Sequence, residues 1–351
     1  MLWVVIIFLA LSLFLYCLLG GADFGAGVLE IFFPSKNKEK YREMVARAMG
    51  PVWEANHIWL IILIVILFNG FPKTYAELSI YFHIPLTLML LGIIFRGCAF
   101  TFRSYDAFWD KSRELYSQVF SYSSLLTPVM FGMIVGGLMS GNADPQAPNY
   151  VLKYVSPWLN VFSFSIGLFT LSIFSFIAAV FLTAETKDEE AVSYFIRQAK
   201  RWNVCLVVSG GVVFGLAQMG GHPFFKIFFK NPVSLIAFFL ATAALIVLWK
   251  ILPRANPWTL RILVGFKLSM ILLAWFAGIF PNMFYFKNGN SLTLFNAAAP
   301  PATLIILGWS LILGSILFLP ALYYLIVVFK GRPDPLSLGP GTIEKHRRPP
   351  V

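Results

Sequence analysis

The chain has 351 residues, of which 58% are hydrophobic and only 12% are charged. A soluble protein carries about twice that share of charged residues, so the composition excludes an ordinary soluble protein of two or three domains. The three cysteines lie far apart along apolar stretches and form no CxxC or CxxCH motif, which excludes a disulfide-stapled secreted scaffold and a c-type haem attachment site. The sequence predicts an all-α polytopic membrane protein.

Charge-free stretches locate the membrane spans, in chain order. A stretch of about 18 or more residues without Asp, Glu, Lys or Arg predicts a transmembrane helix, because a charge at the bilayer centre costs about 2.5–3.5 kcal/mol. Because Asp23 and Glu54 lie inside otherwise helical patterns, we expect some helices to extend past their stretches. The first part of the last stretch, 288–301, is predicted to be a loop. The nine stretches are 1–22, 55–72, 78–95, 115–143, 154–184, 202–225, 231–249, 268–286 and 288–329.

Lysine and arginine are distributed unevenly between alternate connections. Of the 27 such residues, only five fall on one side of the predicted membrane: Lys73, Lys153, Lys226, Lys230 and Lys287. The positive-inside rule assigns the side with the other residues to the cytoplasm, so we expect the N-terminus outside and the C-terminus in the cytoplasm. The net charge of +11 is then a topology signal rather than a sign of nucleic-acid binding. The first span lacks a positive leading segment and a cleavage site, so it is predicted to be retained.

The two halves of the chain share features of a parallel repeat. Each half has a charged first connection, at 35–49 and 184–202, and a Gly-x-Pro turn in its second connection, at 70–72 and 221–223. The alternative is that charged and short loops alternate in all polytopic proteins. We expect a first four-helix bundle over 1–143, a second over 144–286, a peripheral ninth helix with its preceding loop over 287–330, and a disordered cytoplasmic tail over 331–351.

Asp23 is an acidic residue inside the first span, in the sequence GGADFGAG (20–27). Gly20 and Gly27 share its helical face, so another helix or a cofactor can approach closely there. An intramembrane acid is a candidate functional residue. The alternative is tight helix packing with the carboxylate simply satisfied by an arginine. In either case we expect Asp23 to be paired, with an arginine such as Arg96 or with the helix that carries Glu54.

A second group of polar residues, GPVWEANHIW (50–59), leads into the second span. Trp53, Glu54 and His57 share one helical face, and a half-buried carboxyl one turn from an imidazole has the parts of a proton relay. The alternative is a hydrogen-bonded cluster that fixes the start of the helix.

Arginines and histidines complete the set of candidate residues. Arg96 and Arg103, in FRGCAFTFR (95–103), are seven residues apart on one helical face, where they pair with the acids or anchor the span. The remaining histidines, His83, His222 and His346, form no pair suited to a haem, and no Cys/His metal motif occurs. We therefore expect no metal site and no catalytic residue in this chain.

GGADFGAG, GPVWEANHIWLI, the NGFP turn (69–72) and FRGCAFTFR stand in an order and spacing that resemble subunit II of the cytochrome bd-type quinol oxidases, including the cyanide-insensitive branch. The resemblance implies a heterodimer with a homologous subunit I in a bacterial plasma membrane. Subunit I would hold two b-type haems, haem d and the quinol-oxidising loop, and the complex would reduce oxygen to water with protons taken from the cytoplasm. Some members also hold a structural quinone in subunit II or have a small single-helix accessory subunit.

The resemblance also suggests roles for the residues singled out above. Glu54 matches the family's acidic residue on a proton path, and Asp23 matches the Asp of its GxDFG motif. The proton path is expected to contain Glu54, Asp23 and His57, supported by Trp53, Asn56, Arg96 and Arg103. Two alternative functions remain open at this point: a secondary transporter, suggested by the repeat and the intramembrane acids, and a purely structural scaffold.

Overall fold

The structure is a computed structural model, and it describes residues 1–50, 53–105, 111–186, 188–252 and 256–330. The predicted tail 331–351 lies outside the described residues. Residues 1–308 form one compact unit, and the second unit begins at Trp309, within the last helix. The prediction of two four-helix bundles and a peripheral ninth helix stays a prediction.

Within those ranges, nine helical stretches are long and apolar enough to cross a membrane, which confirms the predicted number of spans. The first stretch consists of α1 (Leu2–Leu15), a π-helical segment η1 (Tyr16–Gly20) and α2 (Gly21–Glu30). The others are α4 (Trp53–Gly70), α6 (His83–Tyr105), α7 (Lys111–Ser140), α9 (Val161–Ala184), α10 (Glu189–Met219), α12 (Pro232–Ile251), α13 (Pro257–Ile279) and α14 (Pro301–Lys330).

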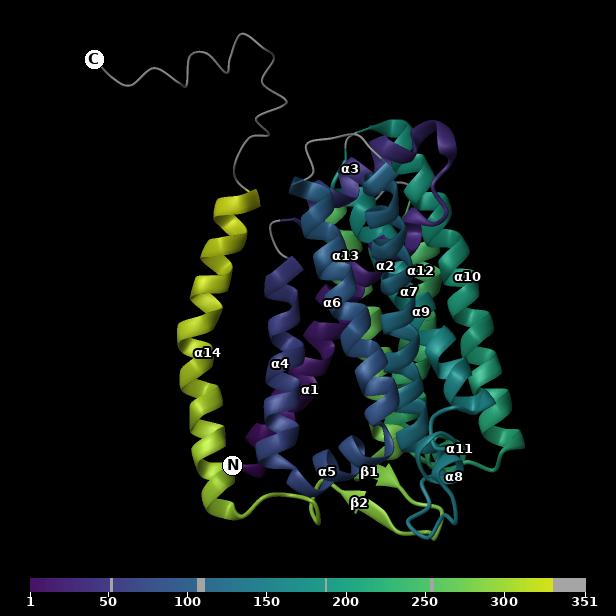
Figure 1. The fold of residues 1–351 in the computed structure, drawn as a ribbon, viewed down its shortest axis with the longest axis vertical. Coiled ribbons are helices and arrows are strands. Elements are labelled where there is room, and N and C mark those ends of the chain that lie inside the picture. Colours follow the sequence, from purple (N-terminus) through teal and green to yellow (C-terminus); the bar gives the residue numbers. More distant parts are fainter. Residues whose placement is uncertain (51–52, 106–110, 187, 253–255, 331–351) are drawn as a thin grey trace. The chain divides into compact units, whose positions relative to one another are not determined.

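Shorter elements lie at the two ends of the first unit (Figure 1). We call one the α3 end, after the amphipathic helix α3 (Lys38–Met49), which follows a short 3₁₀ turn, η2 (Ser35–Asn37). We call the other the hairpin end, after an antiparallel pair of strands that align Phe284 with Leu292. Its elements are α5 (Pro72–Tyr81), α8 (Tyr150–Tyr154), α11 (Pro223–Lys230), β1 (Asn282–Tyr285) and β2 (Ser291–Thr293).

Local sequence explains where several helices begin. The Asn160 side chain accepts a hydrogen bond from the Ser163 backbone at the start of α9, and Asp188 does the same for Glu190 and Ala191 at the start of α10. Such caps satisfy backbone N–H groups that have no partner within the helix. Proline occupies the first turn of α5, α11 and α12, where its missing N–H costs nothing.

Two helices begin earlier than the charge-free stretches predicted. The eighth span was predicted over 268–286, but α13 begins at Pro257 and contains Lys267, which is buried. The helix also ends at Ile279, and strand β1 follows within the predicted span. Lys267 donates a hydrogen bond of 2.6 Å to the Asn203 side chain and lies over the Phe176 ring, so helix packing accommodates a charge that the sequence criterion treated as a boundary. Likewise, α10 begins at Glu189 and includes most of the charged connection predicted at 184–202.

Glycines allow the helices of the core to approach closely. A Cβ on Gly25 of α2 would lie 2.0 Å from the Phe174 carbonyl oxygen of α9, and one on Gly27 would lie 2.1 Å from the Ser124 hydroxyl of α7. Without a strong hydrophobic force between helices inside a bilayer, small residues at contacts are a main source of packing energy. Two neighbouring helices, α9 and α7, therefore pack closely on the glycine-rich segment, where close approach was predicted.

Gly25→Ala is expected to separate α2 from α9, because no real Cβ tolerates a carbonyl oxygen at 2.0 Å. Such overpacking costs about 1–3 kcal/mol or more. The measurement is the thermal unfolding temperature and yield of the detergent-purified protein, both of which should fall. Gly211→Ala in α10 is the matched control, because no heavy atom lies within 4 Å of its added Cβ. Equal unfolding temperatures for the two variants would contradict the packing described here.

Candidate functional site

Asp23 is buried on α2, shortly after the π-helical segment η1. Single π-helical turns within a helix often mark functional sites, because they re-aim the side chains that follow. The Asn56 side-chain amide, on α4, donates a hydrogen bond of 2.6 Å to the Asp23 carboxylate. The expectation that Asp23 is paired is therefore confirmed, and the partner is the helix that carries Glu54.

Arg96 lies entirely inside the protein, with 1% of its surface exposed. Its guanidinium lies over the rings of Phe24 and Phe120, at 4.8 and 5.2 Å from their centroids, and it interacts electrostatically with Asp23. Its Nε and Nη2 atoms have no hydrogen-bond partner among the described residues. The sequence count treated Arg96 as a loop residue on the cytoplasmic side, whereas the structure places it within α6 as a counter-charge to Asp23.

Glu54 is exposed on the first turn of α4, so the prediction that it is half-buried is wrong for this chain by itself. The reason is that one face of α4 is left uncovered. Ile61, Val65 and Phe68 are all exposed, at 60%, 42% and 57%. Ile61 lies seven residues after Glu54, and Val65 and Phe68 follow at further steps of four and three residues. This spacing places all four side chains on one helical face. We call this set the α4 stripe.

His57 lies on the inner side of α4, among aromatic rings. Its ring centroid is 5.7 Å from that of Phe24 and 6.5 Å from those of Tyr16 and Trp53. Its buried Nδ1 has no hydrogen-bond partner among the described residues. Trp53 also contacts Phe100 of α6, at 5.8 Å between centroids, which holds the start of α4 against α6. His57 thus contacts Tyr16 of the π-helical segment and Phe24, the residue that follows Asp23.

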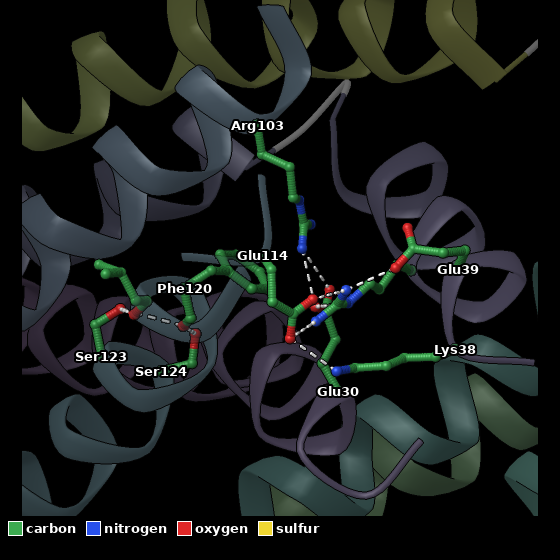
Figure 2. Close-up of polar contacts among 10 residues, drawn as sticks. Glu30, Lys38, Glu39, Arg103, Glu114, Phe120, Ser123 and Ser124 are labelled. Carbon is green, nitrogen blue, oxygen red and sulfur yellow. Dashed lines mark hydrogen bonds and ion pairs between the residues drawn. The ribbon is translucent and has the colours of Figure 1, made fainter. Parts of the chain in front are cut away.

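The sequence reasoning missed a second acid in the first span, Glu30, which is buried at the end of α2 (Figure 2). Arg103 donates hydrogen bonds of 3.1 and 2.9 Å to its two carboxylate oxygens, and Arg42 of α3 lies 3.6 Å away. Arg103 also lies over Phe120, 4.6 Å from its centroid, so this ring contacts both Arg96 and Arg103. A signal was present: Glu30 follows Asp23 by seven residues, just as Arg103 follows Arg96.

The Glu30 group continues to partly exposed side chains of α3 and α7, Lys38, Glu39 and Glu114, which Figure 2 shows linked by dashed lines. Arg42 bonds to Glu114 at 2.7 Å and to Glu39 at 2.6 Å, and Lys38 bonds to Glu114 at 2.9 Å. The carboxylates therefore alternate with cations from the buried Glu30 outwards. The network joins α2, α3, α6 and α7.

A separate ion pair ties α3 to the start of α10. Lys40 pairs with Asp188, the residue that caps α10. The hydrogen bond from Lys40 holds the pKa of the Asp188 carboxyl below its ordinary value. Helix α3 is thus fixed at the surface by contacts with both halves of the chain.

The surroundings of His57 are mainly aromatic. Aromatic rings occupy the space beside the imidazole, and no group of three or more His, Cys, Asp or Glu side chains able to hold a metal occurs in the described part of the chain. His83 and His222 instead bond to the backbone carbonyls of Ile80 and Ser140. His346 lies outside the described residues. The expectation that a partner subunit ligates the haems stays a prediction.

Comparison with known proteins decides the family. The profile of the family described as cytochrome bd terminal oxidase subunit II matches residues 1–329. The chain belongs to this family. As a cytochrome bd subunit II, it shares 30% identity over 158 residues with the cytochrome bd ubiquinol oxidase subunit 2 of Bacillus subtilis, and 26% over 174 residues with the cytochrome bd-I ubiquinol oxidase subunit 2 of Escherichia coli.

These alignments cover only part of each protein: 45% of this chain and 45% of the Bacillus subtilis relative, and 48% of this chain and 45% of the Escherichia coli relative. The fold similarity is more extensive. The structure of the bd oxidase from Geobacillus thermodenitrificans contains a chain that matches with a TM-score of 0.75 at 20% identity, over 93% of this chain and 98% of that one. The fold of that chain is therefore shared along almost the whole of this chain.

Proposed function

We propose that this cytochrome bd subunit II is the non-haem subunit of a heterodimeric quinol:oxygen oxidoreductase. It supports the haem-bearing subunit I and contributes to proton uptake from the cytoplasm for the reduction of oxygen to water. The family assignment over residues 1–329 supports the complex. Haem b and haem d, quinol oxidation and oxygen binding belong to subunit I in this proposal, and a small accessory subunit is compatible with it.

The α3 end faces the cytoplasm of a bacterial plasma membrane in this proposal, with the N-terminus outside. Lysines and arginines support that orientation, because the connections and helix ends at the α3 end contain most of them. Both Glu54 and the Glu30 network then lie on the side from which protons are taken.

The observation that carries the proton path is the position of Glu54 on the α4 stripe. An exposed carboxylate in line with Ile61, Val65 and Phe68 is costly against lipid but suits an interface with another subunit. We propose that the α4 stripe packs on subunit I. Glu54 then accepts protons from the cytoplasm, and His57 and Asp23 line the route on its inner side.

The supporting residues hold this route in place. Asn56 ties the Asp23 carboxylate to α4, and Trp53 fixes the start of α4 against Phe100 of α6. Arg96 supplies the buried counter-charge to Asp23, and Arg103, two turns further along α6, bonds to Glu30 of α2. A carboxylate that releases and accepts protons inside a protein needs such neighbours to limit its desolvation cost.

A cavity of about 380 Å³ in the first unit is the candidate site for a structural quinone. It lies among α1, α4, α7 and α13, and its lining is apolar apart from a few side chains such as Thr74, Ser269 and Asn282. An isoprenoid tail suits such a lining because it offers only apolar surface. We propose this cavity for the tail and assign no residue to the quinone head group.

The transporter alternative, suggested by the repeat and the intramembrane acids, fits the helices less well than the proposal does. Transporters commonly bind substrate at broken helices near the membrane midplane. The spans in the described ranges run as continuous helical stretches, with η1 preserving the helix between α1 and α2. The scaffold alternative differs from the proposal only in the proton path, which substitution of Glu54 tests.

Co-purification tests the proposed assembly. A tag on this chain should recover a second large membrane subunit and visible haem bands, whereas the chain expressed without that subunit should be colourless and inactive with quinol. Haem content and quinol oxidation by the chain alone would refute the assignment of the haems to subunit I. A colourless, monomeric product from the native membrane would refute the complex itself.

A further inference from the structure

The short helix α11 at the hairpin end is strongly amphipathic. Phe224 and Phe228 are buried against Gly278 of α13, where an added Cβ would lie 3.0 Å from each ring. Lys226 and Lys230, one turn apart, are exposed on the opposite face, beside the exposed Phe229. The helix is therefore anchored by aromatic side chains and presents two ammonium groups outwards.

Two facts place α11 at the boundary between membrane and water. It connects the end of α10 with the start of α12, so both of its ends join membrane spans. Aromatic and long cationic side chains are also typical of helices that lie in the interfacial layer. Lys287, at the same end, is paired with Asp144 at 3.3 Å, whereas Lys226 and Lys230 have no carboxylate partner in the part of the chain that the structure describes.

An exposed apolar track runs along the start of α12, which follows α11 after Asn231. Val233, Ile236 and Leu240 are exposed at 47%, 60% and 42%, and their spacing places them on one face of α12. Phe229, near the end of α11, lies four residues before Val233 and is itself 51% exposed; the extended residue Asn231 separates the two helices. Two cations beside exposed apolar side chains match an anionic head group and its acyl chain.

We propose that α11 and the start of α12 bind an anionic phospholipid in the leaflet at the hairpin end. Lys226 and Lys230 contact its phosphate, and an acyl chain lies along Phe229, Val233 and Ile236. The commitment to a lipid rather than a free phosphate rests on the apolar track, which a free phosphate would not use. The site lies apart from the proposed proton path and does not depend on it.

Native mass spectrometry of the purified protein, with whatever subunits accompany it, tests this site. The probes are phosphatidylglycerol and phosphatidylcholine with identical acyl chains, each added with and without excess inorganic phosphate. In the Lys226→Gln/Lys230→Gln variant, the affinity for phosphatidylglycerol should fall about 25-fold, because each lysine near the membrane surface contributes about five-fold. The affinity for phosphatidylcholine should not change.

The matched control is Lys73→Gln/Lys153→Gln, which removes the same charge at the same end of the molecule and should retain wild-type affinity. An equal loss of affinity for phosphatidylglycerol in both double variants would show that the lysines act only by general electrostatic attraction, and it would contradict a specific site. Equal affinity of the wild type for the two lipids would overturn it too. Complete competition by inorganic phosphate would show a simple anion site and contradict the role of the apolar track.

Discussion

Glu54→Gln is expected to lower oxygen uptake per haem by about ten-fold or more, with haem content unchanged, because general acid–base groups contribute at least that much. Reduction of oxygen to water consumes protons, and an amide cannot accept and release them as a carboxylic acid does. Glutamine keeps the side-chain volume, and Glu54 is exposed in this chain, so the fold should tolerate the change. The measurement is steady-state oxygen consumption, normalised to the haem spectrum of each preparation.

Two further variants distinguish a Glu54 that carries protons from one that only supports the fold. Glu54→Asp keeps the acid and should lose less activity. Glu43→Gln, in α3, removes an exposed carboxylate at the same end and should have no effect. Wild-type turnover of Glu54→Gln across the pH range, with intact haem bands, would exclude Glu54 from the proton path. Loss of haem in that variant would indicate a structural role instead.

Glu30→Gln is expected to destabilise the protein strongly, because the buried Arg103 loses its carboxylate partner and Arg42 loses a nearby one. Removing one member of a buried ion pair costs about 3–5 kcal/mol, since the remaining charge stays out of water. We expect a lower unfolding temperature and less assembled protein, with turnover per remaining haem close to that of the wild type.

Glu39→Gln is the control for this network. Its side chain is 45% exposed and bonds to the same Arg42, so water can replace it at little cost. An unfolding temperature for Glu30→Gln equal to that of Glu39→Gln would show that the buried pair adds no stability. A selective loss of turnover in Glu30→Gln, without destabilisation, would instead indicate that Glu30 is part of the proton path.

The fold could be predicted largely from composition, because a bilayer imposes one strong rule on apolar stretches. The number of spans followed from that rule. Several helix ends were misplaced, two of them where a charge lies inside a helix. Lys267 and Arg96 were treated as residues outside the spans, but Asn203, Phe24 and Phe120 surround their charged groups. Which helices pack together cannot be deduced from a charge count.

The candidate site was predictable only in part, for a related reason. Local spacing placed Glu54 and His57 on one helix and singled out Asp23 as an acid that needs a partner. It could not show that Asn56 donates a hydrogen bond to the Asp23 carboxylate, since that depends on how α2 and α4 pack. It also could not show that Glu54 is exposed, because that depends on which face of α4 the chain leaves uncovered. Glu30 was missed because it follows the charge-free stretch, although its helix continues through it.

Proton uptake measured during a single turnover tests the central claim most directly. The fully reduced complex is mixed with oxygen, and haem oxidation is followed together with the absorbance of a pH indicator in the bulk solution. We predict that in Glu54→Gln the first electron transfer to oxygen keeps its wild-type rate, while proton uptake from the cytoplasmic side slows markedly. Wild-type rates for both processes would contradict a proton path through this subunit.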